Sequence, residues 1–444
     1  MQAKIRLILL LLTAGILAPA AVVAQQDSLF ISIDEALEMA SAGNFEVKQS
    51  SQQYEAARQR YRQTYAVYLP QVSVEYNAIS TDNPLNVFGF RLMQKSVTQA
   101  DFDPANLNDP GSFENYSTRF EIRQPLFNPD MMIRRTAAGR QVDAFRENER
   151  GKAEATRFQV KKVYFQLVLM QNQAGVLEEA YNAATEYYRM AQNMQAEGML
   201  SREDMLSARV HQLEVENKLT ETKHGVEEVR QQLALLLGLS GDTHIIPADN
   251  LVARNLAGAE EIAGLEVNNS FIRSARLQKE AAERMANAER FTFVPSVNLF
   301  GAYELNDKDV FGFGSGSYMV GLNVRWNLFS GLSNVGKAGE ARAAAREAGY
   351  MMQHFEYEQE NKVRQALRDK KLAENLLELG REAITQAEED VRIRANRFKE
   401  GLERTTDLLM AETRLSEARL KKMQAVYHYN ISIAALEMLL ETDL

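Results

Sequence analysis

The feature that most constrains the fold of this 444-residue chain is an internal duplication of one arrangement of segments. In each copy a helical stretch ends at a proline, an alternating strand follows, a second strand closes at a Leu-Phe pair, and a long helical tract begins. The first copy has Leu69-Pro70 and Leu126-Phe127, and the second has Val294-Pro295 and Leu328-Phe329. Such a duplication is typical of a wall built from equivalent units and is rarely found in an enzyme.

Both long helical tracts break at an acid-glycine pair, Glu197-Gly198 in the first copy and Glu400-Gly401 in the second. Glycine readily adopts the left-handed conformation that ends a helix, so each pair predicts a turn into a shorter returning helix. The tracts themselves hold no proline between 130 and 246 or after 295. Since an interior proline costs a helix about 3 kcal/mol, these tracts are free to be helical.

Apolar residues in the first tract recur at the alternating spacing of four and three that marks a coiled-coil seam, and a similar stripe, at spacings of three, four and seven, runs along the second tract. A tract of roughly 65–70 residues makes a helix of about 100 Å, and its charged residues indicate that it stands in water. Taken alone, such helices fit a fibrous coiled coil or periplasmic scaffold as well as they fit the wall that the duplication indicates. The seam residues are Val163, Leu167, Met170, Ala174, Leu177, Tyr181, Ala184, Tyr188 and Ala191, then Leu372, Leu376, Leu379, Ala383, Ala387, Val391 and Phe398.

Four segments alternate apolar and polar side chains: 72–77, 118–123, 296–305 and 318–328. This period of two over about 10 residues is what a lipid-facing barrel strand requires. A soluble sheet with one solvated face gives the same pattern. Four strands do not close a barrel, so a membrane sheet would need at least two chains, and the pattern does not choose between two, three and four. The only tryptophan, Trp326, lies near the end of the fourth segment, where it fits a periplasmic membrane interface.

The two hairpin loops differ in length. The first, 80–115, is long, and the second, 306–317, is short and rich in glycine. Long outer loops are typical of membrane barrels. For the long loop we favour a solvated segment with its own small core, and the alternative is that Phe88, Phe90 and Leu92 cap a pore.

The N-terminus predicts a secretory signal peptide over residues 1–24, with Lys4 and Arg6 before an apolar run and a small-residue cleavage site before Gln25. The alternative is an N-terminal membrane anchor, for which the run is short. The formal charge of −9 argues against nucleic-acid binding. The chain has no cysteine, and its five histidines lack metal-ligand spacing, so we expect no catalytic site, no metal and no cofactor.

The sequence resembles the TolC-like outer membrane factors, the outer membrane efflux protein family. The resemblance lies in the paired hairpins after Pro70 and Pro295, the Leu-Phe pairs that close them and the Glu-Gly pairs that break the long helices. The order and duplication of these motifs are specific, although each motif alone is weak. The resemblance implies a mainly α chain with a membrane β-barrel part. Each chain would supply four strands and long coiled-coil helices to a homotrimer with a shared twelve-stranded barrel and an α-helical tunnel.

On this basis the chain divides into a signal peptide, a first repeat over 25–238, an equatorial linker over 239–269 and a second repeat over 270–444. The first repeat holds a helix, a β-hairpin at 71–127 and a helical hairpin at 130–238. The second repeat holds the same parts, with its hairpins at 296–329 and 331–440. The linker, the mature N-terminus and the short tail after Leu440 would form a belt around the tunnel.

The function that the resemblance implies is a passive exit duct of a tripartite efflux or type I secretion system. The duct would lie in the outer membrane of a Gram-negative-type bacterium, with a long periplasmic extension in contact with a periplasmic adaptor. An inner-membrane transporter of the RND, ABC or MFS type would open the duct at its periplasmic tip. Its other partner would be outer-membrane lipid, with no nucleic acid. The alternatives are a periplasmic coiled-coil scaffold or adaptor that does not span the outer membrane, and a diffusion porin.

The resemblance also assigns roles at the tip. Asp407 matches the first of two constricting aspartate rings, while Met410 occupies the position of the second. Asp204 lies at the equivalent place in the first repeat, where capping of its own helix is the competing interpretation. Charge pairs between neighbouring helices would involve Asp204, Glu403 and Arg404, with Arg404 one position from the place of the family arginine. The two turns, with Gly198, Met199, Leu200, Gly401 and Leu402, are expected to contact the adaptor.

Overall fold

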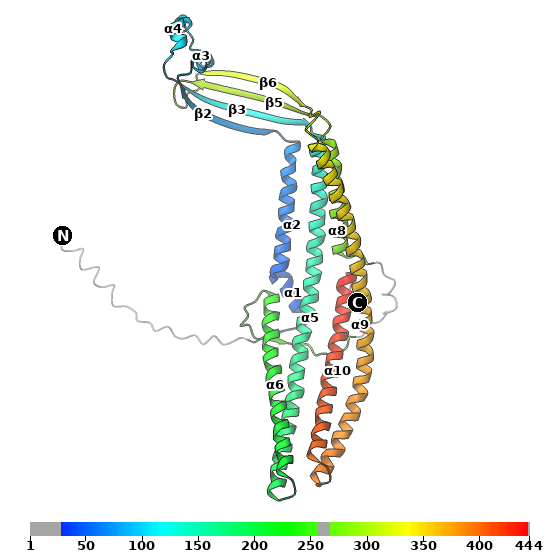
Figure 1. Ribbon diagram of the computed structural model, residues 1–444. Helices are drawn as coiled ribbons and strands as arrows, with labels where there is room; N and C mark the ends of the chain where they lie inside the picture. Colours follow the sequence, from blue (N-terminus) through cyan, green and yellow to red (C-terminus); the bar gives the residue numbers. More distant parts are fainter. Residues whose placement is uncertain (1–27, 255–266, 443–444) are drawn as a thin grey trace, which may run out of the picture.

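The computed structural model describes residues 28–254 and 267–442. The expected signal peptide, and residues 255–266 of the expected linker, lie outside the described residues. Long helices run side by side for most of the length of the molecule, and a four-stranded sheet bends away from them at one end (Figure 1). The expected fold class, mainly α with a β part of four strands, is confirmed.

Two helical hairpins make up about half of the chain. In the first, α5 (Pro129–Ala196, 68 residues) is followed by α6 (Arg202–Leu237, 36 residues). In the second, α9 (Ser333–Lys399, 67 residues) is followed by α10 (Thr405–Leu440, 36 residues). Pro129 occupies the first turn of α5, where its missing N–H leaves no hydrogen bond unmade. Among the described residues, no helix contains a stretch apolar enough to cross a membrane.

Each hairpin of strands is preceded by helix. In the first repeat, α1 (Ile33–Gly43), α2 (Phe45–Gln63) and the short 3-10 helix η1 (Thr64–Val67) run to the start of the sheet. In the second repeat, α8 (Ser270–Phe291) does the same and packs against both α5 and α9. The chain bends between α1 and α2 at Asn44, whose side chain accepts hydrogen bonds from the first N–H groups of α2.

The sheet consists of β2 (Gln71–Thr81), β3 (Phe113–Phe127), β5 (Ser296–Asp307) and β6 (Ser315–Arg325). All neighbours are antiparallel, and the order is β2-β3-β5-β6, so the pairing of β3 with β5 joins the two repeats. The register places one residue from each strand in rows across the sheet. One such row is Val74, Phe120, Tyr303 and Tyr318.

A second, small sheet lies halfway along the helices. In it β1 (Leu29–Ile31) pairs in parallel with β4 (Ile245–Pro247), which belongs to the expected linker. The hydroxyl of the buried Tyr164 lies 2.6 Å from Asp249 Oδ2 and 2.9 Å from the carbonyl oxygen of Ile31. The largest apolar cluster of the described chain surrounds these groups, so the N-terminal segment, the linker and α5 are held together here.

The long loop between β2 and β3 is structured. It contains α3 (Pro84–Met93), the 3-10 helix η2 (Gln99–Phe102) and α4 (Pro104–Asn108). Val87 is buried and Arg91 pairs with Asp101, so the loop has a small core of its own, as the favoured interpretation expected.

The structure corrects two element boundaries. β6 ends at Arg325, before the expected end of the hairpin at residue 329, and α9 begins at Ser333 rather than at 331. The cause is the turn that follows Trp326. Gly331 and Leu332 both have left-handed backbone angles, with φ of 61° and 65°, which neither a strand nor a helix accepts.

Candidate functional site

The two turns between long helices lie at the end of the molecule farthest from the sheet (Figure 1). Gly198 and Gly401 have φ of 75° and 72°, the left-handed conformation that the sequence predicts at these positions. In both turns the next residue, Met199 or Leu402, donates its backbone N–H to the carbonyl five residues earlier at 2.9 Å. The two repeats therefore end their long helices with the same Schellman cap.

The returning helices begin differently. At the start of α6, Ser201 Oγ accepts a hydrogen bond from the N–H of Asp204 at 3.1 Å and donates to Asp204 Oδ2 at 2.6 Å. Asp204 therefore supports the cap of its own helix, as the competing interpretation expected. At the start of α10 the cap position holds Arg404, which makes no side-chain cap, and the buried hydroxyl of Thr405 has no hydrogen-bond partner among the described residues. The second turn therefore lacks the side-chain cap that the first turn has.

Glu403, in the second turn, is only 9% exposed and lies between two arginines of α9. Its carboxylate is 2.8 Å from Arg394 Nη1 and 3.1 Å from Arg397 Nε. Arg394 also pairs with Asp390 at 2.7 Å, so the partners of Glu403 within the chain come from the preceding helix. Arg404 forms no ion pair in the described part of the chain.

Asp407 lies one turn into α10 and is half-buried, while Met410, one turn further, is exposed. The structure thus brings Asp407, Glu403 and Arg404 together in one turn, with Asp204 in the matching turn of the first repeat.

A contact that sequence reasoning missed ties the two hairpins together near this end. Tyr187 of α5 donates its hydroxyl to Glu412 Oε1 of α10 at 2.8 Å. Beside it, Ala191 of α5, Ala208 of α6 and Leu409 of α10 form a buried cluster. The coiled-coil pattern includes Ala191 but not Tyr187. The partner of Tyr187 belongs to the other repeat, so no local sequence pattern predicts the contact.

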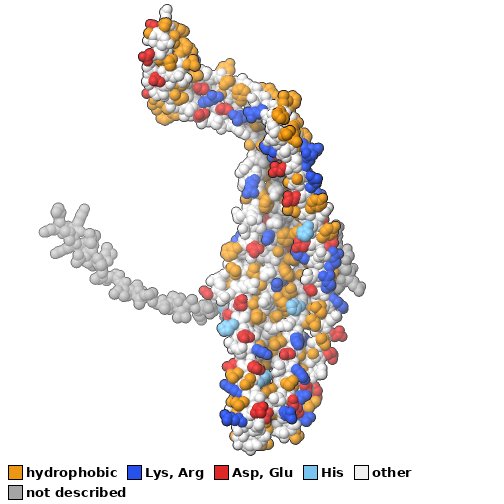
Figure 2. Space-filling view, in the orientation of Figure 1, with side chains coloured by type: hydrophobic (Ala, Val, Ile, Leu, Met, Phe, Trp, Pro, Cys, Tyr) orange, Lys and Arg blue, Asp and Glu red, His pale blue; other side chains and the backbone are white. Residues whose placement is uncertain are grey.

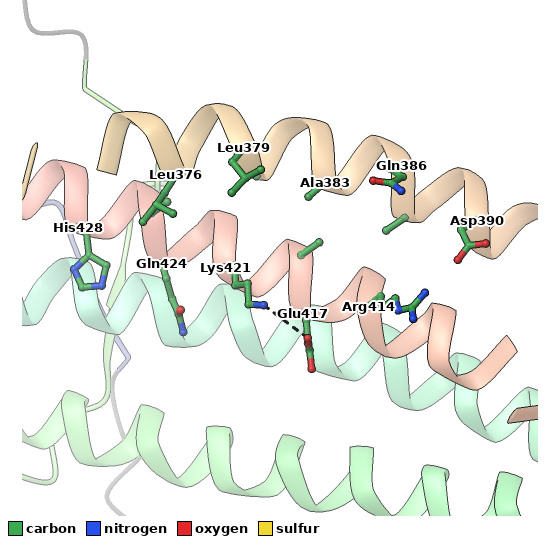
Figure 3. A pocket seen from close by; sticks show the side chains of 14 residues that line it. Leu376, Leu379, Ala383, Gln386, Asp390, Arg414, Glu417, Lys421, Gln424 and His428 are labelled. Carbon is green, nitrogen blue, oxygen red and sulfur yellow. Dashed lines mark ion pairs between the residues drawn. The ribbon is translucent and has the colours of Figure 1, made fainter. Parts of the chain in front are cut away.

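A groove of about 560 Å³ runs between α9 and α10 (Figure 3). Leu376, Leu379 and Ala383 of the expected seam line its apolar part, while charged side chains, among them the Glu417–Lys421 pair at 3.8 Å, line the rest. Leu379 is 64% exposed, whereas Leu167, in the seam of the first repeat, is fully buried. The seam of the second repeat is therefore partly uncovered in a single chain.

The sheet has one apolar face and one charged face. On the apolar face Val72, Val320 and Leu322 are exposed. On the other face Arg119 of β3 lies 3.6 Å from Glu304 of β5. Charged side chains spread over the visible side of the sheet in Figure 2, and hydrophobic ones gather where the sheet meets the helices.

The strand-end residues lie where the sequence suggested. Pro70 directly precedes β2 and Pro295 directly precedes β5. Trp326 follows the last residue of β6 and is largely exposed, and its ring N–H donates to the carbonyl of Phe293 at 3.0 Å. This indole is therefore fixed at the helical end of the sheet, with an apolar ring facing outward and its polar group satisfied.

Known proteins share this architecture. A family model described as outer membrane efflux protein matches residues 36–239 and 263–441. The alkaline protease secretion protein AprF of Pseudomonas aeruginosa is 21% identical over 351 residues, which make up 77% of this chain and 69% of AprF. The outer membrane protein VceC of Vibrio cholerae superposes with a TM-score of 0.78 at 16% identity, over 92% of this chain and 96% of VceC. The CmeC outer membrane channel of Campylobacter jejuni superposes with a TM-score of 0.79 at 17% identity, over 92% of this chain and 85% of CmeC.

Proposed function

The chain belongs to the outer membrane efflux protein family, and from that premise we propose that three copies form the exit duct of a tripartite efflux or type I secretion system. The protein is an outer-membrane channel protein, which decides against a periplasmic scaffold or adaptor that never enters the membrane. The family is a class of channels and not of enzymes. We propose that this chain likewise carries no catalytic activity.

The observation that carries assembly from several copies is the pair of open edges of the sheet. The outer strands β2 and β6 each have a sheet neighbour on one side only, and one face of the sheet is apolar and exposed. In hydrocarbon each unpaired backbone group costs several kcal/mol, so the β2 edge of one copy pairs with the β6 edge of the next until the sheet closes. Three copies give the twelve strands that the family resemblance implies.

The uncovered seam of α9 supports the same assembly in the periplasm. Leu376 and Leu379 line a groove that is open in one chain, and another long helix with an apolar stripe would fill it. The four long helices of each copy would then form one third of a closed tunnel. In this arrangement the described parts of the two repeats, 28–238 and 270–442, form two equivalent segments of the wall, and the described parts of the linker, 239–254 and 267–269, belong to the belt around it.

Opening takes place at the tip. Asp407 of the three copies would constrict the entrance, and the turns with Gly198, Met199, Leu200, Gly401 and Leu402 would contact a periplasmic adaptor. In the ion pair of Glu403 with Arg397 the arginine is 58% exposed, and pairs with such an exposed partner contribute roughly 0–1 kcal/mol each. Partner binding could therefore shift the tip from closed to open. The free energy for export would come from an inner-membrane transporter of the RND, ABC or MFS type.

The mass of the protein extracted from purified outer membranes tests the assembly. Light scattering with the detergent contribution subtracted should give three chain masses. A dimer with a closed sheet of eight strands would contradict the trimer, and a soluble monomer absent from that membrane would contradict the duct itself.

Adaptor docking needs its own experiment, because a trimer could form without it. Charge reversal at Glu403 together with substitution of Met199 and Leu402 should abolish capture of the adaptor in a pull-down and should abolish export. Unchanged capture and unchanged export would place the docking surface elsewhere.

A further inference from the structure

We propose that the β5–β6 turn, residues 308–314, is an anchor that binds the outer-leaflet interface of the membrane on the lipid-facing side of the sheet. This inference rests on the proposed membrane insertion and goes beyond it, because it assigns a partner to one turn at the outer end of the molecule. The partner is a lipid surface, at the boundary between acyl chains and head groups.

The turn folds back over the apolar face. Phe311 stacks on Tyr76 with ring centroids 5.0 Å apart, and its backbone N–H donates to the Tyr76 hydroxyl at 3.2 Å. Tyr76 belongs to β2, at the opposite edge of the sheet from β6. Because side chains alternate along a strand, Tyr76 lies on the same face as Val72 and Val74. The turn is therefore directed to that face and away from the charged face that would line a pore.

The conformation of the turn is specified by its own residues. The Asp307 carboxylate accepts hydrogen bonds from the N–H of Asp309 at 3.1 Å and from the N–H of Gly314 at 2.7 Å. A side chain at Gly312 would collide with this carboxylate, which explains a glycine there. The short, glycine-rich sequence thus encodes one defined conformation of the turn.

This shape holds large apolar groups in the open. Phe311 has φ of 59°, a left-handed angle that is unusual for an aromatic residue. Such strain persists where surrounding contacts fix it and often marks a functional position. Phe311 is nevertheless 70% exposed and Phe313 is 60% exposed. The chain itself does not cover these rings, so the surface that covers them lies outside the chain.

The residues along the apolar face identify that surface as lipid. Tyrosines lie at the outer end next to the turn, aliphatic side chains follow, and Trp326 and Phe293 lie at the helical end. Aromatic residues at both boundaries of an aliphatic band are the signature of a bilayer-spanning sheet. From Tyr318 to Trp326 the chain runs over nine residues, within the range of about 9–11 residues that a tilted transmembrane strand needs. The outer tyrosines are Tyr76, Tyr116, Tyr303 and Tyr318.

The test places a single fluorescent reporter in the turn. Because Trp326 is the only tryptophan, Trp326→Phe provides a tryptophan-free background, and Phe311→Trp then adds an aromatic ring that still stacks on Tyr76. The full-length assembly is reconstituted in phosphatidylcholine vesicles whose acyl chains are brominated close to the head groups. We expect loss of Trp emission in these vesicles, emission at shorter wavelength than in water, and protection from aqueous iodide.

Two neighbouring positions separate failure of the anchor from failure of membrane insertion. Leu322→Trp lies on the apolar face in the middle of β6 and should be quenched by lipids brominated deep in the chain, whereas Asn323→Trp on the other face should not. If Leu322→Trp is quenched by lipid but Phe311→Trp is quenched only by iodide, the anchor is refuted and the duct stands. If neither is quenched by lipid, the sheet does not span the bilayer and both proposals fail.

A second variant tests whether the Asp307 carboxylate fixes the conformation of the turn. Asp307→Ala removes the acceptor for two backbone N–H groups and should move the Phe311→Trp emission to longer wavelength and raise its exposure to iodide. Asp309→Ala, which keeps the backbone donor, is the matched control and should leave the emission unchanged. Equal behaviour of the two variants would show that the Asp307 carboxylate does not hold the turn on the lipid.

Discussion

The hydroxyl of Tyr187 donates to the carboxylate of Glu412 at 2.8 Å and so links the helical hairpin of the first repeat to that of the second. Burial and the nearby carboxylate raise the pKa of Tyr187 above its ordinary value, so the phenol remains a protonated donor at neutral pH. This link lies next to the cluster of Ala191, Ala208 and Leu409, close to the turns through which the duct is proposed to open.

Tyr187→Phe should loosen the tip. The change removes a hydrogen bond to a charged group, which typically contributes about 1.5–3 kcal/mol, and keeps the ring. We expect faster amide exchange around Leu409 and a higher conductance of the reconstituted duct. Tyr181→Phe, on the same helix, is the control and should have little effect. Equal conductance of the two variants would show that the link does not restrain the tip.

Replacing the glycine of either turn should destabilise the protein solely because of the backbone conformation at that position. No atom lies within 4 Å of a side chain added at Gly198 or Gly401, yet both residues have positive φ. Gly198→Ala and Gly401→Ala should therefore each destabilise the protein by about 1–2 kcal/mol. Gly175→Ala, in the interior of α5 with equally open surroundings, should instead stabilise it by roughly 0.5–1 kcal/mol. Thermal unfolding of the three variants checks the difference in sign.

The two tip aspartates should behave differently. Asp407→Asn should lower the preference of the duct for cations, because the proposed ring of carboxylates at the entrance is neutralised. Asp204→Asn should instead weaken the start of α6, where the carboxylate accepts from Ser201 Oγ, and leave ion selectivity unchanged. Reversal potentials in a salt gradient measure the first effect and thermal unfolding the second. A loss of selectivity in Asp204→Asn alone would assign the gate to the first repeat.

The helical hairpin of the first repeat should lose stability in acid. Burial lowers the pKa of His211 below 6.5, because the charged form is desolvated between the helices. A lowered pKa in the folded state means that this contribution is present above pH 6.5 and is lost as the pH falls through the folded-state value. His211→Gln should flatten the dependence of the melting temperature on pH in this window. His224→Gln, at an exposed position on the same helix, should leave it unchanged.

Much of the fold could be predicted because local chemistry determines it. Proline at Pro70, Pro129 and Pro295 restricts where helices run, and glycine at Gly198 and Gly401 sets where they turn back. Alternation along the strands determines which side chains share a face. Each of these signals acts within a few residues, so a single sequence reports it.

The features that could not be predicted depend on distant partners. Both α5 and α9 carry an apolar stripe, but only the packing shows that Leu379 is uncovered while Leu167 is buried. Helices α3 and α4 were missed inside the long loop although Asn83-Pro84 and Asp103-Pro104 carry a cap followed by proline, because each helix is too short to show a period. The pair of Tyr187 and Glu412 joins separate repeats and has no local signature.

The matched lengths of the helices carry an evolutionary consequence. Since α5 and α9 have 68 and 67 residues and α6 and α10 have 36 each, the two turns end at one level. A deletion in one helix alone would shift Tyr187 out of register with Glu412 and leave one turn projecting past the other. The assembly therefore tolerates a change in tunnel length only when all four helices gain or lose residues together, in steps that preserve the seven-residue repeat.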